Sequence, residues 1–93
     1  MAVTIVLPGQ LRDMAGGHGE VILDDDPATV AEAMAILRRA HPAVYERVLT
    51  EHGEVRPHVN LFVDGVEIRR TGGLETPVGG DGEIAIIPAV SGG

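Results

Sequence analysis

The chain of 93 residues contains no cysteine, no tryptophan and no lysine, and its only aromatic residues are Tyr45 and Phe62. Without cysteine it has no disulfide, no thiolate metal ligand and no catalytic thiol. The core must therefore be built from aliphatic side chains. Without lysine, the chain has no side-chain amine that could accept an isopeptide bond.

Clustered positive charge and long apolar runs are also missing. The net charge is −7, and the seven basic residues, all arginine, are scattered along the chain. Nucleic-acid binding requires a basic patch that neutralises phosphates, so we expect no nucleic-acid partner. A positively charged protein partner suits the charge better. No segment is long enough to span a bilayer and no signal peptide is recognisable, so we expect no membrane partner and a cytoplasmic location.

Patterns of side chains that perform catalysis are likewise absent. The four histidines lie in or beside expected loops and share no metal-ligand spacing, so we predict no metal site. The glycine-rich stretches "GGHGEV" and "GGDGEI" precede strands rather than helices, which indicates turns rather than phosphate loops. The sole serine, Ser91, is outside any nucleophile motif. The chain is therefore predicted not to be an enzyme and to hold no cofactor of its own.

The first half of the chain predicts two strands and a helix. Alternating apolar residues indicate a strand at 2–8. Residues 14–19 predict a turn, and residues 19–26 predict a second strand that is antiparallel to the first. Residues 24–42 predict the main helix, with Thr29 as its N-cap and Glu32 completing a capping box. The following stretch adds a short second helix or a turn.

The second half predicts a hairpin and a final strand. Residues 58–70 alternate around Asp64-Gly65, a preferred two-residue turn. After a connection rich in glycine and proline, residues 83–88 form the last strand. Residues 1–88 are thus expected to form one domain, and residues 89–93 a flexible C-terminal tail.

One main helix must cover one face of a mixed sheet of about four or five strands. If the last strand pairs parallel beside the first, the fold is α+β of the β-grasp, ubiquitin-like type. A ferredoxin-like fold is the alternative, but it requires a second long helix that the sequence lacks.

The last strand is apolar on both faces, with Ile84 and Ile86 on one and Ala85 and Ile87 on the other. In a β-grasp sheet, the face opposite the helix would carry Val6, Ile87 and Phe62 in a row. This row is predicted to be an exposed patch for docking a partner protein. The alternative is that a loop covers this face.

The chain ends on Gly92 and Gly93, after this apolar strand and the short stretch Ala89-Val90-Ser91. Six residues beyond Ile87 reach at most about 20 Å from the body of the domain. Glycine has no Cβ, so such a tail can pass through a narrow channel. The group that it would deliver is the α-carboxylate of Gly93.

The whole chain resembles the ThiS/MoaD family of ubiquitin-like sulfur carriers. The resemblance rests on "VTIVLPGQLRD", on "TVAEAMAIL", and above all on "VNLFVDGVEI" followed by "GDGEIAIIPAVSGG". Length, the "GGL" motif and "PAVSGG" make it most similar to the CysO-type carriers.

The resemblance implies that an E1-like adenylating enzyme of the ThiF/MoeB type docks on the patch and threads Val90, Ser91, Gly92 and Gly93 to its own ATP site. Adenylation of Gly93 and displacement of AMP by a sulfur donor would leave a C-terminal thiocarboxylate. A second enzyme would then accept the sulfur. This enzyme would be a PLP-dependent cysteine synthase, a thiosugar or thiazole synthase, or the large subunit of molybdopterin synthase.

Other functions remain open at this point. Within the family, the chain could be a molybdopterin synthase small subunit or a ThiS-type thiazole carrier. Outside this function, it could be a ubiquitin-like modifier whose adenylated carboxylate is passed to a lysine of another protein. It could also be a plain β-grasp interaction module with an accidental Gly-Gly ending.

Overall fold

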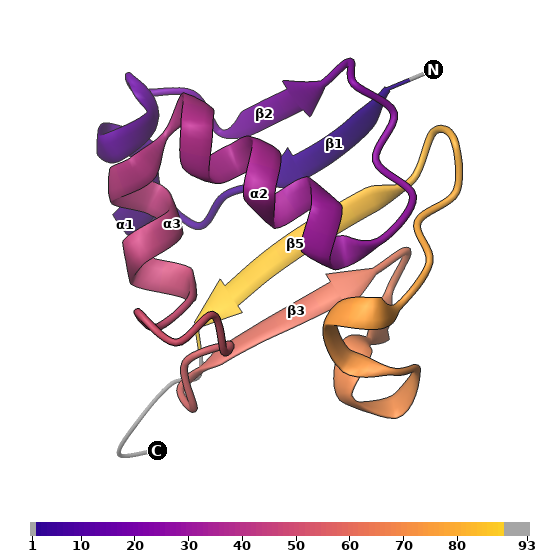
Figure 1. Cartoon of the computed structure of the whole chain (residues 1–93). Helices are drawn as coiled ribbons and strands as arrows, with labels where there is room; N and C mark the ends of the chain where they lie inside the picture. Colours follow the sequence, from indigo (N-terminus) through magenta and orange to yellow (C-terminus); the bar gives the residue numbers. More distant parts are fainter. Residues whose placement is uncertain (1, 89–93) are drawn as a thin grey trace.

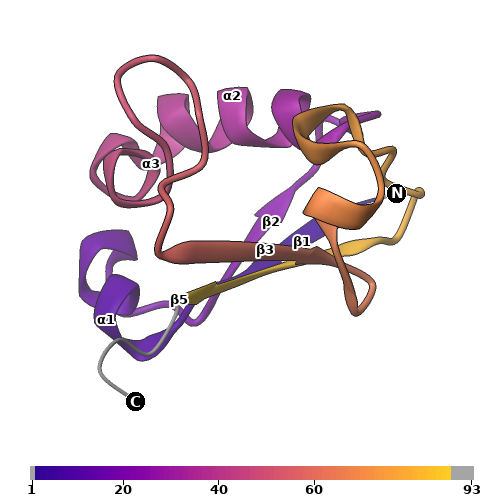
Figure 2. The ribbon, with the colours of Figure 1, turned by 90° about the horizontal axis from the view of Figure 1, so that it is seen from below.

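The computed structural model describes residues 2–88, which form a five-stranded sheet with the longer helices packed on one face (Figures 1 and 2). The strands are β1 (Val3–Val6), β2 (Glu20–Leu23), β3 (Val59–Val63), β4 (Val66–Glu67) and β5 (Glu83–Pro88). The α-helices are α1 (Gly9–Arg12), α2 (Val30–Ala40) and α3 (Pro42–Val48), and three short 3₁₀ turns are η1 (Asp13–Ala15), η2 (Ile68–Arg70) and η3 (Gly73–Glu75). Within residues 2–88, no helix has the length and apolar character needed to cross a bilayer.

The strand order is β2-β1-β5-β3-β4. The first and last strands, β1 and β5, are parallel neighbours, and all other pairs are antiparallel. This is the β-grasp arrangement predicted from the sequence. The ferredoxin-like alternative fails because α3, the second longest helix of the described chain, has only seven residues.

The core lies between the sheet and α2. Alternate residues of the strands face the helix, and the apolar stripe of α2 packs onto them. The fully buried members are Val3 and Ile5 of β1, Ile84 of β5, and Val30, Ala33 and Leu37 of α2. Each large aliphatic side chain buried in this way stabilises the folded state by about 1.5–3 kcal/mol. These side chains can therefore stabilise a small domain whose core contains no aromatic residue.

The start of α2 is capped as the sequence predicts. The Thr29 hydroxyl oxygen accepts a hydrogen bond from the Glu32 amide at 3.2 Å. The Glu32 carboxylate also reaches back, but it accepts from the amide of Ala28 at 3.0 Å rather than from that of Thr29. The first bond satisfies an amide that the first helical turn leaves without an intrahelical partner, and the second ties the residue before the cap to the helix.

Replacement Thr29→Ala is expected to lower the free energy of unfolding by about 1 kcal/mol, because the Glu32 amide loses its acceptor. Urea denaturation followed by circular dichroism measures the change. Thr29→Ser is the matched control. It keeps the hydroxyl, so its free energy of unfolding should fall much less. An equal loss in both variants would show that the methyl group of Thr29, and not the cap, is responsible.

Two local predictions were incomplete. No element was expected at 9–13 and a turn was expected at 14–19, but residues 9–15 form α1 and η1, whose residues Leu11 and Ala15 are buried in the core. The 58–70 hairpin is shorter than expected, because the chain leaves β4 after two residues and η2 turns Ile68 into the core. The predicted turn between β3 and β4 is confirmed.

This turn has positive φ at both central residues, +48° at Asp64 and +87° at Gly65. These are the dihedrals of the hairpin turn that Asp-Gly favours. The Asp64 carboxylate also accepts a hydrogen bond from the Glu83 amide at 3.0 Å. The turn therefore ties the end of β3 to the start of β5.

Candidate docking surface and C-terminal site

The strand register determines which residues are neighbours on the sheet face that points away from α2. Val6 of β1 pairs with Ala85 of β5, and Ala85 pairs with Phe62 of β3. The row across the sheet is therefore Val6–Ala85–Phe62. Ile87 lies two residues further along β5, opposite Asn60. The sequence prediction had placed Ile87 within the row and had left Ala85 out of it.

The four residues Val6, Ala85, Phe62 and Ile87 are called the docking patch below. The first three are half-buried, and Ile87 is 47% exposed. Helices α2 and α3 lie on the other side of the sheet (Figure 2). The long connection between α3 and β3 lies on the helix side of the sheet and does not cover the patch (Figure 2). Within residues 2–88, the patch therefore lies on the face of the sheet opposite α2 and α3.

One margin of the patch is held by Arg69, which connects η2 to β3. Its guanidinium donates to the side-chain oxygen of Asn60 at 2.6 Å and to the carbonyl of Val59 at 3.1 Å. It also pairs with the Glu67 carboxylate at 3.1 Å. An apolar centre with a polar margin is the composition of many protein–protein interfaces.

A shallow depression adjoins Phe62 at this margin. It has a volume of about 410 Å³ and is lined by Asn60, Phe62, Gly65, Val66, Glu67 and Arg70. Val66 also lines this depression, but it pairs with Val63, whose side chain is buried on the helix side, so Val66 is not part of the outward-facing row. A side chain of a partner can occupy this depression and contact Phe62.

The predicted sulfur-carrying site starts where β5 ends. Pro88 pairs with Val59 at this end of the sheet. The residues Val90, Ser91, Gly92 and Gly93 lie outside the described residues. Ile87 precedes Pro88 directly, so a protein bound to the docking patch is within the roughly 20 Å span of the terminal segment.

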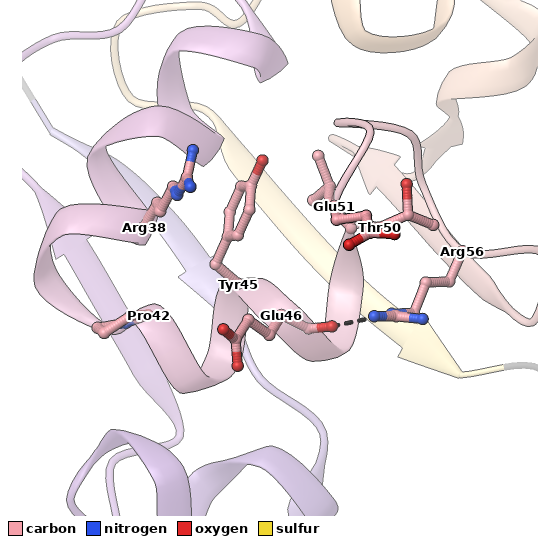
Figure 3. A pocket seen from close by; sticks show the side chains of 8 residues that line it. Arg38, Pro42, Tyr45, Glu46, Thr50, Glu51 and Arg56 are labelled. Carbon is pink, nitrogen blue, oxygen red and sulfur yellow. Dashed lines mark hydrogen bonds between the residues drawn. The ribbon is translucent and has the colours of Figure 1, made fainter.

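A hollow on the opposite side of the molecule does not belong to this surface. It has a volume of about 310 Å³ and lies between α2, α3 and the connection that follows them (Figure 3). The Arg38 guanidinium lies 5.2 Å from the centre of the Tyr45 ring, and Arg56 donates to the carbonyl of Glu46 at 2.8 Å. Arginines and glutamates both line this hollow, so its charge does not favour either an anionic or a cationic ligand.

Metal-ligating side chains do not gather in the part of the chain that the structure describes. No three histidine, aspartate or glutamate residues come together within residues 2–88. His18, His52 and His58 are exposed, and His41 is half-buried at the junction of α2 and α3. The histidines thus occupy separate positions in the described part of the chain.

Comparison with known proteins identifies the family. Residues 5–93 match the ThiS family. The sulfur carrier protein CysO of Mycobacterium tuberculosis is 30% identical over 95 residues, covering both chains completely. Small archaeal modifier protein 1 of Haloferax volcanii is 39% identical over 83 residues, which cover 89% of this chain and 91% of the relative.

The fold is shared with solved structures. A crystal structure of the BexX/CysO complex of Amycolatopsis orientalis contains a chain that superposes with a TM-score of 0.87 at 33% identity, covering 99% of this chain and all of that one. The resemblance drawn from the sequence motifs and the predicted β-grasp fold are both confirmed. Because the family match extends over nearly the whole length, the chain belongs to the ThiS family.

Proposed function

We propose that this chain is a sulfur carrier whose Gly93 carboxylate is adenylated by an E1-like enzyme and converted to a thiocarboxylate. The chain is a protein co-substrate of its partner enzymes rather than a catalyst. Its sulfur goes into the biosynthesis of cysteine or of another sulfur-containing metabolite. Since the first step consumes ATP, we place this cycle in the cytoplasm.

The main support is the alignment with relatives over their whole length. The family match extends through Gly93, and the CysO relative, named a sulfur carrier, is covered completely. The reacting end of the chain is therefore part of the similarity. The docking patch, which includes Ala85 and the exposed Ile87 of β5, the strand that leads to this end, supports the same proposal.

The chemistry follows from the low reactivity of a carboxylate. An oxygen of the Gly93 carboxylate attacks the α-phosphorus of ATP, and pyrophosphate leaves. The mixed anhydride that results has AMP as a good leaving group. Hydrosulfide then attacks the acyl carbon and AMP departs, and loss of the thioacid proton leaves a C(O)S⁻ group on Gly93. ATP and any magnesium belong to the adenylating enzyme.

The tail and the patch have separate tasks in this cycle. Gly92 and Gly93 have no side chain, so the terminal carboxylate fits a narrow active site. Val90 and Ser91 join them to the domain, and the docking patch holds the domain on the enzyme. The same surfaces would serve the acceptor, a cysteine synthase or another sulfur-accepting biosynthetic enzyme. Among the other family functions, the molybdopterin and thiazole pathways remain alternatives for the acceptor.

The test is the intact mass of the chain after incubation with ATP, sulfide and an E1-like enzyme. We expect a mass gain equal to the exchange of one oxygen for one sulfur, and formation of AMP and pyrophosphate. Omission of ATP is the control and should leave the mass unchanged. If no AMP forms with any of several E1-like enzymes, the chain is an interaction module instead.

A ubiquitin-like modifier is the second candidate, favoured by the 39% identity to small archaeal modifier protein 1. In this case the Gly93 adenylate would acylate a lysine of another protein. The same incubation, supplemented with cell extract, distinguishes the two functions. A carrier accumulates as a free thiocarboxylate, whereas a modifier appears in larger covalent products. Because this chain has no lysine, such products would contain one copy per acceptor lysine.

A further inference from the structure

The outer edge of β2 forms a second surface, separate from the tail. β2 stands at one end of the sheet order, and β1 is the only strand of the described chain that pairs with it (Figure 1). Open strand edges attract other strands, and proteins usually blunt them with charge, proline or a covering segment. Here β2 is short, with four residues from Glu20 to Leu23.

The hydrogen-bond pattern shows which backbone groups of β2 are free. The amide of Leu7 donates to the carbonyl of Gly19 at 2.9 Å, so this pair is a hydrogen-bonded one. Bonded and non-bonded pairs alternate in an antiparallel ladder, so Val21 and Leu23 also bond to β1. The N–H and C=O groups of Glu20 and Ile22 therefore point away from β1. The amide of Thr4, the partner of Ile22, accordingly donates to the opposite side, to the carbonyl of Gly82 at 3.0 Å.

The side chain at the centre of this edge is unusually exposed for its type. Ile22 is 59% exposed, more than the other two large exposed apolar side chains, Val66 and Ile87. It points to the same sheet face as the docking patch, because Val21 and Leu23 on either side of it are buried toward the helix. An added strand would cover Ile22 and bond its free backbone groups at the same time.

Charge decides which strand fits. Glu20 precedes Ile22 by two residues, and Asp24, Asp25 and Asp26 follow β2, all of them exposed. A second copy of this chain, paired antiparallel about Ile22, would place Glu20 of one copy beside Asp24 of the other. Like charges directly opposite each other destabilise a strand pair, whereas opposite charges stabilise it. The edge therefore repels itself and attracts a basic strand.

We propose that the outer edge of β2 binds an extended segment of a partner protein in which an apolar centre is flanked by basic residues. The segment adds a sixth strand to the sheet. Its central side chain packs on Ile22, and basic side chains two positions before and after it pair with Glu20 and Asp24. Main-chain bonds supply part of the affinity, and the charges supply the specificity. The inference concerns a second contact of the carrier and does not depend on the chemistry of Gly93.

The test uses two peptides that differ only in charge, acetyl-Ser-Arg-Val-Ile-Val-Arg-Ser-amide and the same peptide with both arginines replaced by glutamate. They are titrated into the ¹⁵N-labelled full-length chain at low salt, and amide shifts are followed by NMR. We expect the basic peptide to bind about tenfold more tightly. The largest shifts and the slowed amide exchange should fall on Glu20 and Ile22, and the difference should shrink as salt is added.

Variants at Ile22 separate the backbone from the side chain. Ile22→Pro removes the isoleucine side chain and, from the backbone, only an amide that points to solvent, so the edge strand tolerates it, and binding should be lost. Ile22→Ala keeps this amide and should weaken binding by a smaller factor. The amide-exchange result on the unaltered chain stands even if the proline variant fails to fold.

Three outcomes would overturn the proposal. The first is equal affinity for the two peptides, and the second is a set of shifts on the docking patch without β2. The third is a concentration-dependent dimer with protected β2 amides in the peptide-free chain, which would make a second copy the occupant. A chain lacking Gly93 should bind the basic peptide as well as the full chain does. Failure of the sulfur chemistry would therefore leave this test intact.

Discussion

Removal of Gly93 is expected to abolish adenylation and sulfur loading while leaving the domain folded. The new terminal carboxylate, on Gly92, would stand one residue short of its position, which is about 3.5 Å along an extended chain. Adenylation needs the attacking oxygen within bonding reach of the α-phosphorus, and a misplacement of about 1 Å already costs on the order of 100-fold. We therefore expect the rate of pyrophosphate release to fall by at least about 100-fold.

Stability should not change, because the core is built from residues between Val3 and Ile86. The midpoint of thermal unfolding serves as the control for the truncated chain. Gly93→Ala is a second control, because it keeps the carboxylate at the correct distance and adds only a methyl group. Gly93→Ala should lower the rate of pyrophosphate release less than the deletion of Gly93 does. Sulfur loading of the truncated chain at the normal rate would contradict the assignment of Gly93 as the reacting residue.

Placing a long charged side chain at the centre of the docking patch is expected to weaken binding to the adenylating enzyme. Ala85 is opposite both Val6 and Phe62, so the Arg side chain of Ala85→Arg would cover the middle of the row. An interface centre is normally packed and desolvated, and disruption there typically costs about 2 kcal/mol or more. We expect KM for the carrier to rise about thirtyfold, with kcat nearly unchanged because Gly93 is intact.

Ala35→Arg provides a matched control. Ala35 is exposed on α2, on the opposite side of the sheet, and the substitution is chemically identical. It should leave KM near its original value, and it controls for the change in net charge. If both variants raise KM equally, the effect comes from charge and not from the patch. If neither does, the enzyme docks elsewhere, and the proposal for Gly93 would still stand.

The β2 edge and the docking patch give the carrier two contacts that differ in chemistry. The patch is apolar and lies on β1, β3 and β5, whereas the edge combines backbone groups, Ile22 and acidic side chains. A single partner that covers the outer face could use both, because Ile22 lies on that face. The peptide titration and the Ala85→Arg kinetics examine these contacts separately.

The local features of the chain were readable from its sequence because each depends on residues close together. The alternation of Val3 and Ile5 specified the inward face of a strand, and Thr29 with Glu32 specified the start of the helix. Asp64-Gly65 specified a turn with positive φ. Even here α1 was missed, since four residues without an acidic first turn or a side-chain cap carry too little signal for a helix.

The sequence by itself thus determined the main strands and the main helix, the β-grasp order, the two faces of the last strand and the residue types of the ending. Only the tertiary structure decided which outward-facing residues are neighbours. Ala85 became the centre of the patch, and Ile22 the centre of an open edge, through the registers of β1, β2, β3 and β5. Register is a relation between strands far apart in the chain, and a slip of one residue would turn every side chain to the other face. It is set by the packing of the whole core, which no local pattern in the sequence contains.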